Sequence, residues 1–419
     1  MSTTTVPSFQ TSAKRRVLMV AACPFPAARG TPARILRMAE ELGRRGHEVH
    51  VAAYHLGDKL DKAPFTLHRI CNVPTYRKME PGPAYQKLAV VDPLLAWKVA
   101  DLTRKLHPDV IHAHHYEGLL VSLPTRLRNA CPIVFDAHVL LDGELEYYSL
   151  GLSSRFRRNI ACKLDGWAPH WCDHVIAISQ EIRDRLCGEH EISPSDISIV
   201  ANGVEDMFFQ GQSNFFPDDG ERRLIYTGNL ASYQGTDFML EAFAIVARQR
   251  RDVRLVIATD SNPREFEAHA RNLRIAERID YLNVPLKALP HLIASADVAL
   301  NPRTRCPGVP LKLLNYMAAG AAIVSFAGSA KYLVHGRNGW VVNDGDVAEF
   351  AAGILALLDS TEQRTQLGNE ARSFAAHSLS WAQNAAAVER VYDLVLGARY
   401  AESREHPASV SPIKTPPAT

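Results

Sequence analysis

The residues with the clearest chemical potential lie in the stretch PGVPLKLLNYMAAGAAIV, at 307–324. Gly308 and Pro310 form a tight turn ahead of a helical apolar pattern, so the backbone there can approach a ligand closely. The unpaired amides of the first helical turn carry partial positive charge, and Lys312 adds a full one. This pattern predicts an anion-binding helix start. The alternative is an ordinary connection from a helix to a strand, with Gly320 ending the helix.

A second group of chemically versatile side chains is the HAHH run, which contains His112, His114 and His115. Alternate residues of a strand share a face, so the first two could bind a metal ion together. No carboxylate or cysteine pattern in the sequence joins them. We therefore expect a structural role for these histidines and no metal site.

Composition is typical of a globular protein in water. The chain has 419 residues, of which 47% are hydrophobic and 22% charged, and this suits two or three domains with their own cores. The net charge of +2 argues against a protein that binds nucleic acid through many phosphate contacts. We expect two basic clusters to be solvated helix faces: Arg155, Arg157 and Arg158, and Arg248, Arg250 and Arg251.

Cysteine usage and the N-terminal region bear on the compartment. The seven cysteines are scattered without a CxxC pair, which favours a reducing compartment over a disulfide framework. The apolar run VLMVAA follows a basic stretch, but it is short and precedes Pro24 and Pro26, which is typical of a buried first strand. No window approaches the length of a membrane span. We expect a cytoplasmic protein.

Short apolar strands alternate with longer amphipathic helices, which is the pattern of a parallel sheet covered on both faces. The pattern occurs twice. The first series starts with a strand at 17–22 and a helix for which Thr31 is the expected cap, with Pro32 in the first turn. The second series starts with a strand at 224–228 and a helix that begins near Thr236.

This organisation predicts an α/β protein with two Rossmann-like, doubly wound parallel-sheet domains that face each other across a cleft, with ligands at the carboxyl ends of the strands. We expect the first domain at 1–211 and the second at 212–375. A helix at 376–400 has no strand after it and is expected to cross back to the first domain. The proline-rich end, 401–419, is expected to be disordered.

The order and spacing of short motifs along nearly the whole chain resemble glycosyltransferase family 4, the retaining nucleotide-sugar enzymes with the GT-B fold. The motifs that carry the resemblance are FPAARGTPAR, LGRRGHEVHV, DVIHAHHYEG, DAHVLLDGEL, DHVIAIS, IVANGV, YTGNLASYQG, SADVALNPR and the 307–324 stretch. Each motif is weak by itself, but their ordered set is more specific than a single Gly-rich loop. The resemblance implies that the two predicted domains form a GT-B fold.

In the first domain, the resemblance implies contacts with both substrates. The loop that ends in Gly30 matches a loop that lies against the donor diphosphate, where glycine permits close approach. His138 matches a histidine that hydrogen-bonds the transferred sugar, a role that suits a neutral imidazole. Glu144 and Glu117 are the candidates for the acceptor side. The alternatives are a plain strand-to-helix turn at Gly30 and a structural histidine at 138.

The second domain departs from the family pattern where the diphosphate is expected to bind. Relatives carry an arginine and a lysine at positions that match Asn229 and Gln234. Losing two charge-assisted hydrogen bonds forgoes about 1.5–3 kcal/mol each, so other cations must replace them. We expect Arg303 and Lys312 to contact the diphosphate, and Arg305 is a further available cation.

A second departure concerns two glutamates that relatives place near the donor sugar and on the ribose. The matching positions here are Pro307 and Asn315. Asn315 can still donate to and accept from ribose hydroxyls, whereas Pro307 cannot act as a carboxylate. We expect the sugar to meet the backbone amides of Val309 and Leu311 instead, with Gly308 completing the donor site.

The resemblance implies hexosyl transfer with retention, from a nucleotide diphosphate sugar to a lipid-linked or saccharide acceptor, in cell-surface polysaccharide or glycolipid synthesis. The leaving diphosphate takes the acceptor's proton, so the chemistry needs positioning and charge stabilisation but no cofactor or metal. The segment YRKMEPGPAYQKLAVVD, at 76–92, mixes basic and aromatic residues such as Tyr76 and Lys87 with apolar ones. It fits either a lipid acceptor with peripheral contact at the inner membrane face, or a solvated loop.

Two other functions stay open. A protein that kept the GT-B fold, lost catalysis and became a binding or scaffold partner would explain the replaced donor-site residues. A two-Rossmann oxidoreductase or sugar-nucleotide epimerase is the second, although no GxGxxG motif opens either half of the chain.

Overall fold

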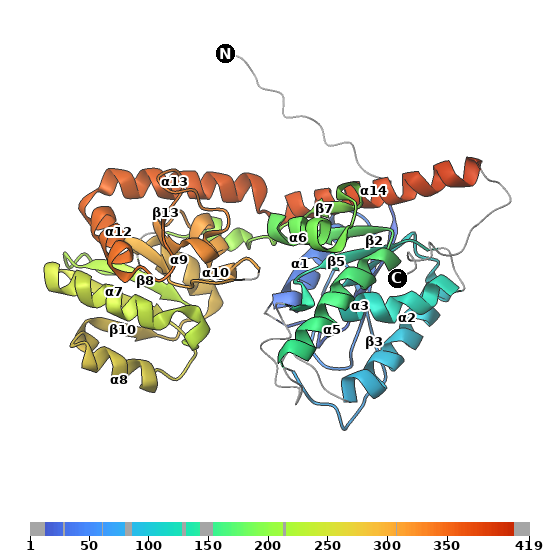
Figure 1. The fold of residues 1–419 in the computed structure, drawn as a ribbon, viewed down its shortest axis with the longest axis horizontal. Coiled ribbons are helices and arrows are strands. Elements are labelled where there is room, and N and C mark those ends of the chain that lie inside the picture. Colours follow the sequence, from blue (N-terminus) through green and yellow to red (C-terminus); the bar gives the residue numbers. More distant parts are fainter. Residues whose placement is uncertain are drawn as a thin grey trace, which may run out of the picture. The chain divides into compact units, whose positions relative to one another are not determined.

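The computed structural model describes residues 13–27, 30–60, 62–79, 86–127, 131–142, 154–212, 215–306 and 308–405. The chain divides into two compact units (Figure 1). The first unit extends to Ala201 and resumes at Asn384, and the second comprises Asn202–Gln383. The boundary expected from the sequence lies after residue 211. In the structure the segment after Ala201 joins the second unit, because Val204 pairs with Ser380 and Gly203 lies against the Trp381 ring.

Among the described residues, the first unit contains a seven-stranded sheet in the order β3-β2-β1-β4-β5-β6-β7. All of its pairings are parallel, and its inner strands, such as RVLMVA, are buried on both faces, whereas the edge strands β3 and β7 are partly exposed. The strands are β1 (Arg16–Ala21), β2 (Glu48–Ala53), β3 (Thr66–Arg69), β4 (Val110–His114), β5 (Ile133–Ala137), β6 (His174–Ala177) and β7 (Ile197–Ile199). The helices are α1 (Gly30–Arg44), α2 (Asp92–Leu106), α3 (His115–Ser122), α5 (Ser154–Trp167), α6 (Gln180–His190) and α14 (Trp381–Glu405).

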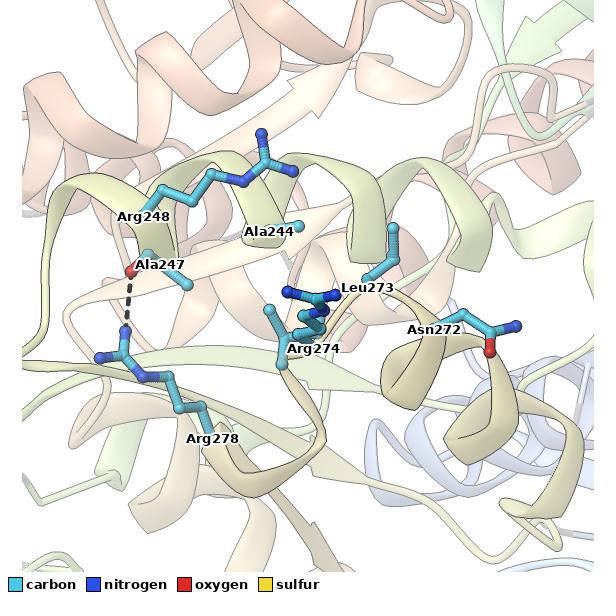
Figure 2. Close-up of a pocket in the computed structure, with 8 residues that line it drawn as sticks. Ala244, Ala247, Arg248, Asn272, Leu273, Arg274 and Arg278 are labelled. Carbon is cyan, nitrogen blue, oxygen red and sulfur yellow. Dashed lines mark hydrogen bonds between the residues drawn. The ribbon is translucent and has the colours of Figure 1, made fainter.

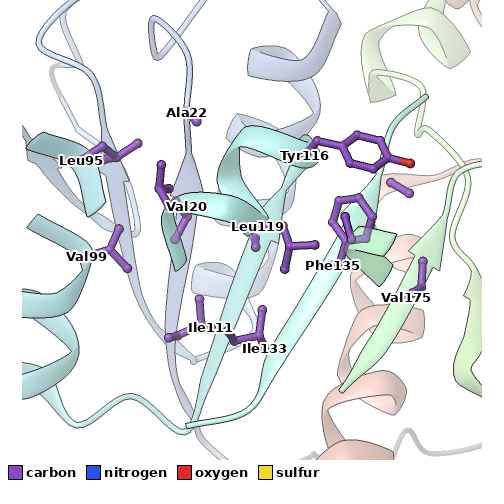
Figure 3. Packing of buried hydrophobic residues seen from close by; sticks show 14 of the residues in the cluster. Val20, Ala22, Leu95, Val99, Ile111, Tyr116, Leu119, Ile133, Phe135 and Val175 are labelled. Carbon is purple, nitrogen blue, oxygen red and sulfur yellow. The ribbon is translucent and has the colours of Figure 1, made fainter. Parts of the chain in front are cut away.

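Helices α2 and α3 pack against this sheet through the main apolar core. Figure 3 shows Leu95 and Val99 of α2, and Tyr116 and Leu119 of α3, beside buried strand residues such as Ile111. Because these strand side chains are buried in the core, the register of each strand is fixed. The positions of the residues that follow each strand are fixed with it.

The C-terminal helix α14 belongs to the first unit from Asn384 onward. Its Glu389 accepts hydrogen bonds from Nε and Nη2 of Arg45, both at 2.7 Å. The hydroxyl of Tyr392 lies 2.7 Å from Nδ1 of His112, a strand residue. The helix continues past the end predicted at 400, and residues 406–419 lie outside the described residues.

The second unit contains, within the described residues, a six-stranded parallel sheet in the order β10-β9-β8-β11-β12-β13. Its strands are β8 (Arg222–Thr227), β9 (Val253–Ala258), β10 (Ile279–Leu282), β11 (Val298–Asn301), β12 (Ile323–Phe326) and β13 (Trp340–Val342). Its helices are α7 (Thr236–Gln249), α8 (Arg264–Asn272), α9 (Leu289–Ala294), α10 (Leu311–Ala318), α11 (Ala327–Ala330), α12 (Val347–Asp359) and α13 (Thr361–Ser378). Helices in the described part of the chain are all too short or too polar to span a lipid bilayer.

Candidate active site

The two sheets place the predicted site residues beside their topological switch points, where β1 meets β4 and β8 meets β11. Ligands of doubly wound sheets bind at the carboxyl ends of the strands at such points. In the first unit, Gly30 opens α1 after β1, and His138 directly follows β5. In the second unit, Arg303 follows β11 and Lys312 lies in the first turn of α10. Each unit therefore contributes one cluster of predicted residues.

The first cluster is built around a buried ion pair between α1 and β5. Nε of Arg34 donates to Oδ2 of Asp136 at 3.0 Å, and Nη2 donates to Oδ1 at 3.1 Å. The side chains are 3% and 0% exposed, so the pair is cut off from solvent. Burial alone would raise the pKa of Asp136, but Arg34 and the neighbouring His138 hold it well below its ordinary value. Asp136 is therefore ionised, and its charge is neutralised within the protein.

His138 lies beside this pair with both ring nitrogens in contact with protein groups. Its Nδ1 is 3.1 Å from Oγ1 of Thr31, and its Nε2 is 3.2 Å from Nδ1 of His114. Burial is the largest influence on its pKa and lowers it, so the imidazole is neutral near pH 7. Thr31, the predicted helix cap, lies inside the first turn of α1 with its hydroxyl directed to His138, because the helix already begins at Gly30.

Within the described part of the chain, His112, His114 and Asp136 could hold a metal ion, since their ligand atoms lie within 4.8 Å of one another. Arg34 already donates to both oxygens of Asp136. A metal ion bound there would face a fixed positive charge across its carboxylate ligand, which opposes binding. The arrangement fits a hydrogen-bonded histidine network better than a cation site, and the independence of catalysis from metal stays a prediction.

Glu117, predicted on the acceptor side, lies on α3 and is paired within the protein. Nζ of Lys87 donates to its Oε1 at 2.5 Å, and Nδ1 of His115 contacts its other oxygen. Lys87 and Tyr76 are buried, so the structure corrects the expectation that these two residues of the 76–92 segment meet an acceptor or membrane. The ion pair draws one side chain inward, and packing against a neighbouring tyrosine draws in the other.

The second cluster centres on Lys312. Its Nζ donates to Oε1 of Gln234 at 3.0 Å and lies 3.9 Å from the centre of the Tyr226 ring. Gly228 passes beside it with φ +121°, where an added Cβ would lie 3.4 Å from Nζ. Burial, together with the positive charge of Arg303, lowers the pKa of Lys312 to about 7. No carboxylate among the residues that the structure describes pairs with this amine.

Arg303 is held near Lys312 by an aromatic ring and a backbone carbonyl. Its guanidinium lies 5.0 Å from the centre of the Tyr233 ring, and its Nε donates to the carbonyl of Arg305 at 2.7 Å. Nδ2 of Asn229 donates to the Tyr233 hydroxyl at 3.0 Å. Asn229 is exposed, whereas Gln234 is buried, so the two predicted replacements for the missing cations have different environments.

The turn before α10 brings the predicted backbone positions to the helix start. Pro310 immediately precedes the helix, which begins at Leu311, so it lies one position before the predicted first turn. Val309 is buried, Leu311 is 42% exposed, and Gly308 and Asn315 are partly buried. Two other predicted residues lie outside the described residues: Glu144 and Pro307.

The residues that organise both clusters were not predicted from the sequence. Arg34 and Asp136 form the buried pair, Thr31 contacts His138, and Tyr226 supports Lys312. The only available signal was local: Asp136 lies near the end of a predicted strand and His138 follows two residues later, a spacing that in extended backbone directs both side chains to the same side. A charged residue on an amphipathic helix gives no comparable sign of burial.

A hollow in the second unit lies away from these residues (Figure 2). It has a volume of about 620 Å³ and lies between the end of α7 and the segment after α8, with Arg248, Arg274 and Arg278 around it. Nη1 of Arg278 donates to the carbonyl of Ala247 at 3.0 Å. Arg248 of the predicted basic cluster faces this hollow, while Arg250 pairs with acidic residues. The hollow includes none of the predicted site residues.

Two family models match the chain. The model described as Glycosyltransferase Family 4 matches residues 28–207, and the model described as Glycosyl transferases group 1 matches residues 221–360. The chain belongs to glycosyltransferase family 4. Both clusters of this family 4 member thus lie within the matched regions. Its two parallel-sheet units form the GT-B fold, as solved structures show.

Relatives and solved structures cover much of this family 4 member. An uncharacterized glycosyltransferase of Methanocaldococcus jannaschii is 19% identical over 53% of the chain, and the match spans 58% of that relative. A D-inositol 3-phosphate glycosyltransferase of Corynebacterium efficiens is 23% identical over 85% of the chain and 88% of that relative. Sucrose-phosphate synthase of Thermosynechococcus elongatus superposes with a TM-score of 0.77 at 17% identity, covering 92% of this chain and 100% of that chain. Anabaena Alr3699/HepE, solved in complex with UDP, gives 0.68 at 16% identity, covering 93% and 99%.

Proposed function

We propose that the protein transfers a sugar, with retention, from a nucleotide diphosphate sugar to a lipid-linked or saccharide acceptor in cell-surface polysaccharide or glycolipid synthesis. The observation that carries this proposal is Lys312, a partly buried amine at a switch point with no carboxylate partner among the described residues. A buried charge is costly unless it is paired. Arg303 adds a second positive charge nearby, which increases the cost until an anion arrives.

A nucleotide diphosphate is an anion of suitable charge for this position. Its phosphates would accept hydrogen bonds from Lys312 and Arg303, and the start of α10 adds backbone amides after Pro310. The structure of Anabaena Alr3699/HepE in complex with UDP supports a nucleotide donor for a protein of this fold. The base and the sugar are left to experiment.

The proposed reaction moves the sugar without a protein nucleophile. The bond from the anomeric carbon to the diphosphate oxygen breaks, and the acceptor oxygen bonds to the same face of that carbon. The proton of the acceptor hydroxyl passes to the departing diphosphate. Lys312 and Arg303 stabilise the negative charge that grows on the diphosphate, and the neutral His138 network contributes positioning.

A membrane contact is part of the proposal for the acceptor. The short helix Lys87–Val91 and helix α2 expose three large apolar side chains: Leu88 at 64%, Val90 at 42% and Trp97 at 69%. Lys98 follows Trp97 on α2 and would lie near anionic headgroups. We expect co-sedimentation with vesicles that contain anionic lipid at low salt. Equal recovery of the wild type and of a Leu88→Ser, Trp97→Ser variant would contradict this surface.

The donor site is tested by removing both cations. The screen uses uridine, guanosine and adenosine diphosphate sugars, and measures affinity by calorimetry and turnover by release of the nucleoside diphosphate. We expect Arg303→Met, Lys312→Met to lose at least about a hundredfold in affinity, because each charge-assisted contact contributes about 1.5–3 kcal/mol. Arg251→Met, which removes an exposed cation of the same unit, is the matched control. Unchanged affinity in the double variant would refute the assignment.

The screen also separates an enzyme from a protein that only binds. Turnover of one nucleotide sugar by the wild type supports transfer. Tight binding without turnover, in the presence of lipid and saccharide acceptors, would favour the inactive GT-B alternative.

A further inference from the structure

The Thr31–His138–His114–Asp136 chain determines which hydrogen bond the first cluster can offer a ligand. Both nitrogens of the His138 ring are already in contact with protein groups, at 3.1 Å to Thr31 and 3.2 Å to His114. The ring itself is only 8% exposed. Thr31, at the end of this hydrogen-bonded series, is partly exposed and is therefore more accessible to a ligand than the His138 ring.

The position of each proton follows from Asp136 outward. Nδ1 of His114 lies 3.3 Å from the ionised Oδ2 of Asp136, so this nitrogen carries the hydrogen. Nε2 of His114 is buried and has no hydrogen-bond partner among the described residues. The opposite tautomer would bury an N–H group without an acceptor, which native structures avoid.

The proton on His114 then determines the tautomer of His138. The single hydrogen on Nδ1 of His114 is shared between Oδ2 of Asp136 at 3.3 Å and Nε2 of His138 at 3.2 Å. Nε2 of His138 itself lies 3.7 Å from Oδ2, too far to donate to the carboxylate, so this nitrogen is the acceptor. The hydrogen of the neutral His138 ring is therefore on Nδ1, and it is donated to Oγ1 of Thr31 at 3.1 Å. The Thr31 hydroxyl thus accepts from the ring and keeps its own hydrogen for another partner, and no second contact of this hydroxyl occurs among the described residues.

We propose that the hydroxyl of Thr31 donates a hydrogen bond to the sugar nucleotide, and that His138 is a positioning residue that orients this hydroxyl. The inference rests on the proposed function, since it needs the donor at this edge of the sheet. The ligand group that Thr31 meets is an acceptor oxygen, on the diphosphate or on the transferred sugar. Thr31 directly follows Gly30, the residue predicted to lie against the diphosphate.

The network is tested first in the full-length protein without ligand. Histidine labelled with ¹⁵N gives tautomer-specific nitrogen shifts for each ring. We expect His138 to carry its hydrogen on Nδ1, and Thr31→Val to shift that nitrogen while the His112 ring, bonded to Tyr392, keeps its signals. A hydrogen on Nε2 of His138 would overturn the proposal, whatever the activity of the protein.

The ligand contact is tested by kinetics with the nucleotide sugar found in the screen. We expect Thr31→Val to lower kcat/KM by about tenfold or more, and Thr31→Ser, which keeps the hydroxyl, to stay within about threefold of the wild type. Thr103→Val removes a buried hydroxyl that donates to the carbonyl of Val99 on α2, and it is the control for loss of a threonine hydroxyl elsewhere. Wild-type kinetics in Thr31→Val would overturn the contact.

Substitutions of His138 separate positioning from packing. Asn places its amide nitrogen near the position of Nδ1 and can donate to Thr31, whereas Gln reaches the position of Nε2. We expect His138→Asn to retain more activity than His138→Gln, and equal losses would count against the positioning role. A wild type that binds no nucleotide sugar would overturn the proposed function and the ligand contact together, while the ring tautomers would still decide the network.

Discussion

The two clusters at the sheet edges handle buried charge in opposite ways. In the first unit, Arg34 and Asp136 neutralise each other at 3.0 and 3.1 Å, and neutral histidines surround them. In the second unit, Lys312 is partly buried against an amide and an aromatic ring, and Arg303 adds repulsion. The first network needs no ligand to balance its charge, whereas the amine of Lys312, with its pKa lowered to about 7, becomes fully charged when an anion binds beside it. This difference agrees with the proposal that the first cluster orients groups and the second binds an anion.

The largest expected effect comes from removing the negative charge of the buried Arg34–Asp136 ion pair. Asp136→Asn leaves Arg34 buried with its positive charge unneutralised, so we expect the free energy of unfolding to fall by about 3–5 kcal/mol. Urea denaturation measures the loss. The matched control is Asp280→Asn, which removes the partner of the more exposed Arg254 and should cost about 1 kcal/mol or less.

Acid unfolding gives a second readout of the same variant. The pKa of Asp136 is lower in the folded protein than in the unfolded chain, so its contribution to stability is complete above about pH 4 and is lost as the pH falls. We expect Asp136→Asn to reduce this acid dependence. Equal losses of stability in the Asp136 and Asp280 variants would show that the buried pair is not special.

The next largest effect should come from placing a carboxylate beside Lys312. Gln234→Glu puts a carboxylate 3.0 Å from Nζ of Lys312, so the protein supplies the negative charge that the ligand should bring. We expect the affinity for the nucleotide sugar to fall by about 10- to 100-fold, with stability unchanged or raised, because the carboxylate also repels phosphate. Calorimetry and urea denaturation measure the two quantities. Gln249→Glu, at an exposed position of α7, is the control, and an affinity loss of the same size there would contradict the argument.

A smaller effect should follow from pH alone. Lys312 has a pKa of about 7 in the free protein, and a bound diphosphate raises it. Above pH 7 binding must therefore take up a proton, so we expect the affinity to fall by up to about tenfold per pH unit from 7 to 9 and to be flat below 7. A nucleotide sugar is the right ligand, because it lacks the terminal phosphate that titrates near neutrality. Calorimetry at pH 8 in two buffers of different ionisation enthalpy should detect the proton uptake, which Lys312→Met should abolish.

The smallest expected effect is at the exposed rim of the same site. Asn229→Ala removes the side-chain hydrogen bond to Tyr233, while the backbone carbonyl that accepts from Tyr226 stays. We expect a loss of affinity of about threefold or less, since exposed hydrogen bonds contribute little. A loss as large as that of Gln234→Glu would mean that Asn229 touches the ligand directly.

The fold could be predicted because its signal is local and repeated. Apolar runs such as the strand at 17–22, followed by helices with one apolar stripe, indicate a parallel sheet wherever they occur, and β1 is found at Arg16–Ala21. Two such series predict two Rossmann-like domains, which the structure confirms. The place of Lys312 in the first turn of a helix was predictable for a similar reason, since the turn, the helix start and the lysine are neighbours in sequence.

The charge balance of the site could not be predicted, because it depends on contacts between distant residues. Arg34 lies on an amphipathic helix, where a charged side chain is normally solvated, and its burial requires Asp136 from another strand. Gln234 matches a position where relatives carry a cation, and the sequence does not indicate that its amide oxygen accepts a hydrogen bond from Lys312. The sequence around Lys87 resembles that of a segment whose lysines contact a membrane surface. In the structure Lys87 is buried, because it pairs with Glu117.

Helix α14 has a consequence for the order in which the protein is made. Its Tyr392 reaches His112 of the buried cluster, and its Glu389 binds Arg45 and contacts His47. These contacts join the end of the chain to the domain that the ribosome produces first. Because α14 is synthesised after the second domain, the first domain lacks this helix until the second domain has been made. Its folding can be completed only then.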